Sequence, residues 1–297
     1  MRALRHAILC LAGALSVAGA GCQRGPRIDV GAVRVAQGAL AEPLREAGLD
    51  EAALERAARD ALVAEGFRKG ADVRAAHTAR VDVLAVRLSA PSGDRPAVEV
   101  SVEIQLVPPE GAAGLDARET GTGSAPLAGS TPAEAWSRAL AGAARGAAAG
   151  LALARKEAAK PTGEVIADLS SQDARVRGHA VRALAERRDA TALPALVARL
   201  EDPDPEIVMR AVGALAQLRD RRAVGPLIDL SRKGDPALTA RLARVIGDIG
   251  GPEARGYLLT VEAGHLDPRV QRSAREALEE MDARQRQEAA GRVAAGR

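Results

Sequence analysis

Few side chains in this sequence could do chemistry. Beyond Cys22 the histidines are His77, His179 and His265. None forms a His-Glu-x-x-His helix, and none has a neighbouring Glu or Cys that could complete a metal site. The residue pattern therefore predicts no catalytic residue, no metal site and no cofactor. His179 is expected at an exposed edge of a helix, where replacement by Ala would cost little.

Cys22 is the one residue whose surroundings indicate a specific reaction. A basic start is followed by the apolar stretch 7–18 and then by Gly19, Ala20 and Gly21 directly before the thiol. This is the organisation of a secretory signal, and the apolar stretch is shorter than the roughly 20 residues that a membrane-spanning helix needs. The segment 1–21 is therefore predicted to be a signal peptide that is removed.

With Cys22 at this place, the segment resembles the signal of bacterial lipoproteins. The resemblance implies cleavage between Gly21 and Cys22 and attachment of diacylglycerol to the Cys22 thiol, and it departs from the family in having Gly19 where Leu is usual. An ordinary signal, cut near Ala18 or Ala20, is the alternative. Removal of the signal takes Cys10 with it, so Cys22 would have no intramolecular disulfide partner.

The resemblance also implies a location. A lipid-anchored chain, with residues 22–27 as its linker, belongs in the cell envelope. Gln23, rather than Asp, follows the cysteine, which by resemblance to enteric sorting signals favours the periplasmic face of the outer membrane.

The composition makes nucleic acid an unexpected partner. The 42 basic and 39 acidic residues nearly balance, whereas binding to a phosphate backbone needs a net positive surface. One Trp, one Tyr and one Phe in the whole sequence also leave no stacking platform for single strands.

Residues 28–157 have the pattern of a small α+β domain. We expect a strand at 28–36, a helix after Asp50, a hairpin of strands at 78–88 and 97–107, a weaker strand within 115–123, and a helix from Pro132 to about Glu157. The stretch "ALVAEGF" at 61–67, the following hairpin and the alanine-rich last helix resemble domains of exported lipoproteins of the curli-secretion and penicillin-binding-protein-activator families.

Glycines suggest how that last helix packs. Gly142, Gly146 and Gly150 recur at every fourth position, a spacing that also occurs in dimerising membrane helices. Arg138 and Arg145 interrupt the run, so close packing on the sheet is the favoured interpretation. The stretch "GTGSAP" at 121–126 is similar to part of a dinucleotide-binding loop but has Pro where the third Gly belongs.

Residues 158–283 contain an internal repeat. Similar segments begin at Asp173, Asp204, Asp235 and Asp267, at an almost constant spacing. Each Asp is placed to cap a helix, apolar residues follow at helical spacing, and a second helix follows each of the first three units. The pattern resembles HEAT repeats of the type found in phycobilin lyases, which implies stacked helix pairs with a continuous core.

Half a unit precedes the first repeat. Val165 and Leu169 match the second-helix positions, and the helix ending near Glu157 could be its partner, so one shared helix could join the two domains. Residues 284–297 lack periodicity and are expected to form a flexible tail. The fold class is therefore multidomain: a small α+β domain followed by an all-α HEAT-type solenoid.

The function predicted from these features is that of a membrane-anchored envelope lipoprotein. It would act as a protein-binding scaffold or adaptor rather than as an enzyme. The exposed faces of the second helices around Arg199 and Asp229 are the predicted binding surface for an envelope protein. The alternative is a HEAT-type lyase or chaperone-like enzyme, which the export signal disfavours.

Overall fold

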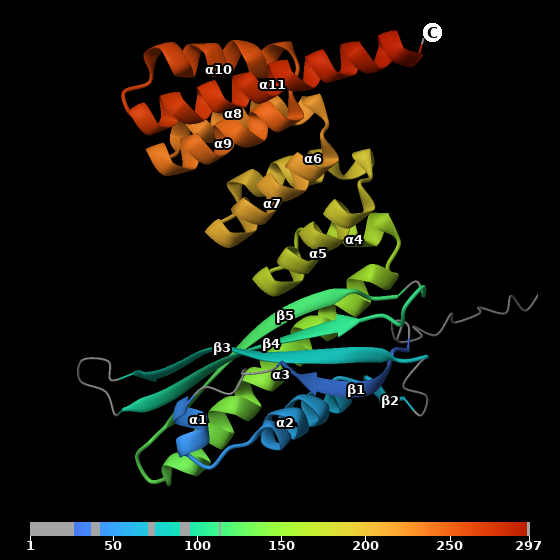
Figure 1. Cartoon of the computed structure of the whole chain (residues 1–297), viewed down its shortest axis with the longest axis vertical. Coiled ribbons are helices and arrows are strands. Elements are labelled where there is room, and N and C mark those ends of the chain that lie inside the picture. Colours follow the sequence, from blue (N-terminus) through green and yellow to red (C-terminus); the bar gives the residue numbers. More distant parts are fainter. Residues whose placement is uncertain (1–26, 37–41, 71–74, 90–95, 113, 296–297) are drawn as a thin grey trace, which may run out of the picture.

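The computed structural model describes residues 27–36, 42–70, 75–89, 96–112 and 114–295. The predictions for Gly21 and Cys22 lie outside these residues. The chain forms a mixed sheet with helices on one face, followed by a curved stack of helices (Figure 1). This is the α+β domain and all-α solenoid that the sequence predicts.

The α+β domain contains a five-stranded sheet of order β2-β1-β3-β4-β5. β1 is parallel to β2 and β3, whereas the β3, β4 and β5 ladders are antiparallel. The expected elements are all present, and α1 and β2 are two short additions that the sequence did not indicate. The elements are β1 (Asp29–Val35), α1 (Glu42–Glu46), α2 (Glu51–Ala64), β2 (Arg68–Lys69), β3 (His77–Ser89), β4 (Ala97–Val107), β5 (Ala117–Pro126) and α3 (Pro132–Ala159).

The two long helices of this domain begin at the capping residues that the sequence predicts. The Asp50 side chain accepts a hydrogen bond from Ala53 N at 2.7 Å at the start of α2. Thr131 and Glu134 form a reciprocal capping box at the start of α3. Such caps bind backbone N–H groups that have no partner in the first turn of a helix.

Glycines bring α3 and β5 into backbone contact. A Cβ atom on Gly121 would lie 2.0 Å from the Ala143 carbonyl oxygen, and one on Gly123 would lie 2.1 Å from that of Ala139. Facing them on α3, Gly146 and Gly142 would each place a Cβ within 3.2 Å of a β5 Cα atom. The glycine spacing therefore serves helix-on-sheet packing, and "GTGSAP" is part of strand β5.

The solenoid consists of helix pairs. First helices begin after the four capping aspartates, whose side chains each accept a hydrogen bond from a first-turn N–H at 2.7 to 2.9 Å. Second helices follow and include short 3-10 turns. The helices are α4 (Thr162–Asp168), α5 (Ala174–Arg187), α6 (Leu193–Ala198), α7 (Pro205–Leu218), α8 (Val224–Lys233), α9 (Pro236–Ile249), α10 (Pro252–Gly264) and α11 (Pro268–Ala295).

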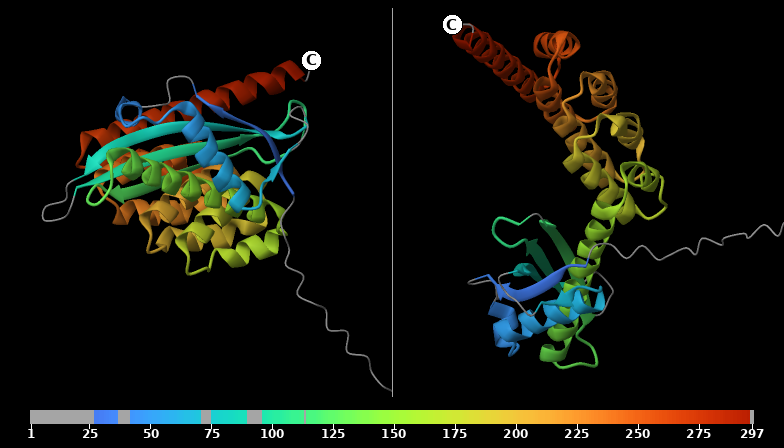
Figure 2. Two further views of the ribbon diagram at one scale, coloured as in Figure 1. Left: turned by 90° about the horizontal axis from the view of Figure 1, so that it is seen from below. Right: turned by 90° about the vertical axis from the view of Figure 1, so that its right-hand side faces the viewer.

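The repeat columns form one continuous core. Leu196, Leu227 and Leu258, at the same position in successive second helices, are fully buried, as is Val165 of the preceding half unit. In the right-hand view of Figure 2 the stack is curved, with second helices along its outer side and first helices along its inner side. The sheet of the α+β domain lies at the lower end of this inner side.

The end of the chain differs from the expectation. Helix α11 continues to Ala295, whereas the sequence pattern predicts that the repeats end at 283 and that a flexible tail follows. The physical reason is propensity: Arg, Gln, Glu and Ala form helix well without an apolar face, so the last turns continue a helix that already packs on α9 and α10. Among the described residues no helix is both long and apolar enough to cross a membrane.

Candidate functional site

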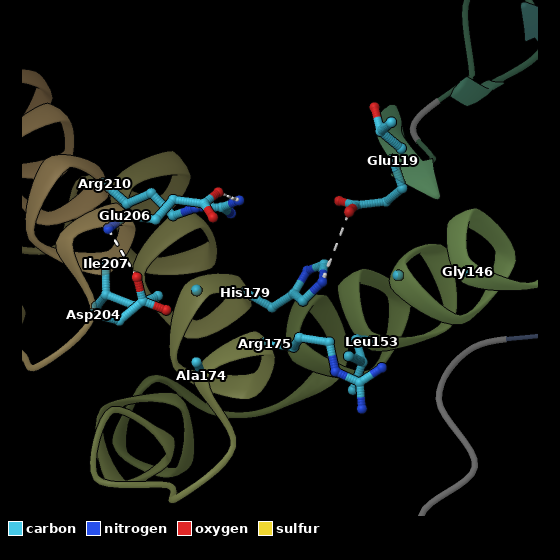
Figure 3. A pocket seen from close by; sticks show the side chains of 13 residues that line it. Glu119, Gly146, Leu153, Ala174, Arg175, His179, Asp204, Glu206, Ile207 and Arg210 are labelled. Carbon is cyan, nitrogen blue, oxygen red and sulfur yellow. Dashed lines mark hydrogen bonds and ion pairs between the residues drawn. The ribbon is translucent and has the colours of Figure 1, made fainter. Parts of the chain in front are cut away.

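A cleft lies where the sheet meets the first helices of the solenoid (Figure 3). We call it the interdomain cleft. Its volume is about 270 Å³. Strand β5 and helix α3 form one wall and helices α5 and α7 form the other; the lining residues used below are Glu119, Thr120, Arg175, His179, Glu206 and Arg210.

His179 lies between the two domains. Its side chain is only 7% exposed, and Nε2 is 3.9 Å from Oε2 of Glu119. Burial lowers the pKa of His179 to about 4, and the neighbouring Arg182, Arg210 and Arg175 guanidinium groups contribute to that shift. The imidazole is therefore neutral at pH 7. The prediction of an exposed helix edge was wrong, because the α+β domain covers this face of α5.

Glu119 on β5 connects the sheet to the solenoid. Burial raises the pKa of its carboxyl, while Arg182 opposes that shift. Arg182, on α5, forms an ion pair with Glu119 and also lies 3.5 Å from the carbonyl oxygen of Arg118. The contact therefore crosses from one domain to the other.

A second connection between the domains lies at the end of α3. Arg187 of α5 donates to the carbonyl oxygens of Glu157 at 2.8 Å and Lys160 at 2.7 Å. Lys160 in turn pairs with Glu157 at 2.6 Å and contacts Asp168 of α4. Since the last α3 carbonyls lack helical partners, Arg187 satisfies them from the first repeat, as expected for a helix shared by both domains.

A second depression, the second-helix groove, lies between α6 and α8. Its volume is about 520 Å³, and Val197, Leu200, Pro226 and Leu230 supply its apolar lining. Glu201, Asp229 and Lys233 supply its charges. The groove lies on the exposed face of the second helices, where the sequence predicts protein binding.

The structure separates the two residues predicted to bind a partner. Asp229 lines the second-helix groove, and its side chain is 66% exposed beside Arg232. Arg199 instead donates to the carbonyl oxygen of Leu169 at 2.8 Å and lies 3.4 Å from Asp202. Its guanidinium therefore connects neighbouring repeats, and Asp229 is the better placed of the two to contact a partner.

A buried ion pair stiffens the same junction between repeats. Arg177 of α5 binds both carboxylate oxygens of Asp202, at 2.8 and 2.9 Å. Its remaining nitrogen donates to the carbonyl oxygens of Ser171 and Gln172. Because the guanidinium and the carboxylate are both used within the fold, the role of this pair is structural.

Within the described ranges no three His, Cys, Asp or Glu side chains are grouped so that they could hold a metal ion. The cleft residues Glu119 and Arg210, and Arg182 that pairs with Glu119, were missed from the sequence. One weak signal existed, since His179 and Arg210 occupy the same position relative to the capping aspartates of their repeats, but nothing in it indicates that a sheet faces them.

The comparisons with known proteins bear on the repeats. The HEAT repeats family matches residues 164–238. The solenoid is of the HEAT type. This match spans α4 to the start of α9 and so includes the second-helix groove. No curated protein matches the chain.

Two engineered proteins solved by the Northeast Structural Genomics Consortium are similar to part of the chain. One is 22% identical with a TM-score of 0.32 and covers 47% of this chain and 74% of its own. The other is 24% identical with a TM-score of 0.33 and covers 46% of this chain and 74% of its own. Similarity this low supports no statement about function.

Proposed function

We propose that this chain is a lipid-anchored scaffold of the bacterial cell envelope that binds another envelope protein through its HEAT-type repeats. The second-helix groove carries this proposal. Aliphatic side chains and Pro226 line it together with Glu201, Asp229 and Lys233, whose charged side chains are largely exposed. Apolar centres with polar rims are typical of surfaces that bind protein segments.

The charges favour one class of partner segment. Glu201 and Asp229 present carboxylates whose side chains are 80% and 66% exposed, and Lys233 lies 3.4 Å from Glu201. An apolar side chain followed by Arg or Lys would fill the floor and pair with Asp229. Rim charges of this kind steer the encounter and select the partner.

Anchoring through Cys22 would hold this scaffold at the membrane, at the periplasmic face of the outer membrane. The support is the signal organisation before Cys22 and the Gln that follows it. Replacing Cys22 by Ala should move the protein to the soluble fraction and abolish incorporation of labelled fatty acid. If Cys22→Ala stays in the membrane and the wild type takes up no label, the anchor is wrong.

Binding is tested on the full-length chain. A fragment starting at residue 158 would remove α3 from its contact with α5, so a loss of binding by that fragment would be ambiguous. Asp229→Arg should reduce the protein cross-linked and co-purified from envelopes by about tenfold, because it reverses a rim charge. The matched control is Asp60→Arg on the exposed face of α2. If both variants recover the same partners as the wild type, the groove is not the binding surface.

A further inference from the structure

Strand β5 leaves one side of the sheet open. It is the last strand in the sheet order, and its ladder with β4 runs without a register shift from Ala117, opposite Leu106, to Pro126, opposite Ala97. The other long edge of β5 faces the interdomain cleft, since Glu119 and Thr120 line it.

Two contacts reveal which backbone groups point toward the cleft. Leu127 N donates to Pro96 O, on the β4 side, whereas the carbonyl oxygen of Arg118 approaches Arg182 of the solenoid. In an antiparallel ladder alternate residues direct both N–H and C=O to the same neighbour. The outward residues are therefore Arg118, Thr120, Thr122 and Ser124, and among the described residues only Arg182 reaches their backbone groups.

From Thr120 on, this edge lacks the usual protection against pairing. Charged side chains, Pro and bulges commonly block free strand edges, but residues 120–125 contain no charged residue and no Pro, the ladder with β4 has no register shift, and the first proline is Pro126 at the end of the strand. Arg182 of the solenoid contacts this edge at the Arg118 carbonyl oxygen and at the Glu119 carboxylate. Next to that contact, Glu119 and Thr120 line the cleft of about 270 Å³, whose other wall is formed by α5 and α7.

We propose that the free edge of β5 binds an extended segment of a partner protein as an additional strand within the interdomain cleft. Backbone hydrogen bonds supply the affinity in this mode and pockets beside the strand supply the selectivity. The site is separate from the second-helix groove and goes beyond the proposed scaffold function, because it lies on the inner side of the curve (Figure 2).

The cleft also has hydrogen-bonding groups that could bind side chains of that segment. His179 lines the cleft with a side chain more than nine-tenths buried, and its Nδ1 has no hydrogen-bond partner among the described residues. Arg210 uses Nε and Nη2 on Glu206, and Arg175 uses Nε and Nη2 on Asp173. Their remaining Nη1 groups are donors for a carboxylate or a carbonyl oxygen of the segment.

The surrounding helices favour a single strand over a second copy of the sheet. Since α5 and α7 wall the far side of the cleft, a partner sheet approaching β5 edge to edge would meet the solenoid. An extended segment needs only the space of one strand, about 4.8 Å from its neighbour.

The test selects peptides from a phage-displayed library of random segments of about twelve residues, long enough for one strand, on the full-length protein. A selected peptide is synthesised with and without N-methyl groups at alternate residues. N-methylation of the residues facing β5 should weaken binding at least about tenfold, because it removes the donors. Amide exchange of Thr120, Thr122 and Ser124 should slow when the unmodified peptide is bound.

Protein variants give the matched comparison. Thr122→Pro removes an outward N–H that the β4 ladder does not use, so the sheet should survive and peptide affinity should fall at least about tenfold. Thr122→Val keeps the backbone donor and should change the affinity by less than about threefold. Asp229→Arg should leave peptide binding unchanged, which separates this site from the groove.

Three results would overturn the proposal. The first is the recovery of no peptide that protects the outward β5 amides. The second is equal binding by N-methylated and unmodified peptides. The third is self-association of the chain through β5 in place of peptide binding, which would make the edge a contact between copies.

Discussion

The two domains build their cores in different ways. In the solenoid, aliphatic side chains such as Leu196, Leu227 and Leu258 repeat at one position and stack on each other. In the α+β domain, α3 approaches β5 through Gly121, Gly123 and the alanines facing them, so backbone contacts backbone. The solenoid core depends on large side chains at repeated positions. The α3–β5 contact depends on positions that have almost no side chain.

This difference explains how one helix serves both domains. The first half of α3 has Gly and Ala where it faces the sheet, so it packs closely on β5. Its last turn presents carbonyl groups to which Arg187 of the first repeat donates hydrogen bonds. The interdomain cleft opens between these two contacts. Substitutions can therefore separate the two kinds of core.

The largest expected effect is at Gly121. Gly121→Ala would place a Cβ atom 2.0 Å from the carbonyl oxygen of Ala143, where only backbone movement could relieve the clash. We expect the free energy of unfolding to fall by about 5 kcal/mol or more, or the domain to fail to fold. Thermal unfolding followed by circular dichroism measures it, with the neighbouring exposed Thr122→Ala as control. A loss no larger than the control's would show that α3 can move away easily.

Leu215 tests the solenoid core. It is fully buried in α7, so Leu215→Ala should lower the free energy of unfolding by about 2 to 5 kcal/mol through lost burial and a cavity. Urea denaturation measures the change. Leu259→Ala, at a half-exposed position in α10, should cost far less. Equal effects at the two positions would contradict the stacked core.

His179 tests the contact between the domains through pH. Its pKa is about 4 in the folded chain, against an ordinary value of 6.5. Between these values the unfolded chain binds a proton that the folded chain does not. The contribution of neutral His179 to the free energy of unfolding is therefore complete above pH 6.5 and is lost as the pH falls toward 4. The loss is at most roughly 3 kcal/mol. Because His179 is buried between the domains, this prediction replaces the expectation that His179→Ala would cost little stability.

The measurement compares denaturation of the wild type and His179→Gln between pH 7 and pH 4. The wild-type stability should fall more steeply. Glu119 has the opposite effect on stability as the pH falls, because its raised pKa lets the folded chain take up a proton more readily than the unfolded chain. The contribution of Glu119 should remain in the His179→Gln variant. Parallel curves for the two proteins would mean that His179 is not held neutral between the domains.

The smallest expected effect is at Gly213 and has the opposite sign. This glycine lies inside α7, and a Cβ atom there would meet nothing within 4 Å. Gly213→Ala should raise the free energy of unfolding by about 0.5 to 1 kcal/mol, because Gly is a poor helix former. Denaturation of the Gly213→Ala and Gly121→Ala variants under the same conditions compares their free energies of unfolding. Destabilisation at Gly213 would reveal a neighbour absent from this structure.

Much of the fold could be predicted because its signals are local or periodic. The capping aspartates at 173, 204, 235 and 267 mark helix starts directly, and the regular repeat spacing places Leu196 and Leu227 in one core. Strand β4 alternates apolar and polar residues along its whole length and was bounded correctly. The short β2 and α1 have no such periodicity, which is why they were missed.

The candidate sites were predictable only in part. The sequence indicated that second helices expose a face at Asp229, but the carbonyl contact of Arg199 with Leu169 depends on how one repeat sits on the previous one. Glu119 and His179 are distant in the sequence and belong to different domains. No local pattern indicates that they meet.

The sequence alone determined the helix pairs, their caps, the repeat and the alternating strands, because each of these depends on interactions between near neighbours in the chain or on one repeated position. Tertiary structure decided the buried neutral state of His179, the interdomain cleft and the open edge of β5. Those features arise where the end of α3 orients the first repeat against the sheet. Burial and charge at that junction depend on groups that only the folded chain brings together.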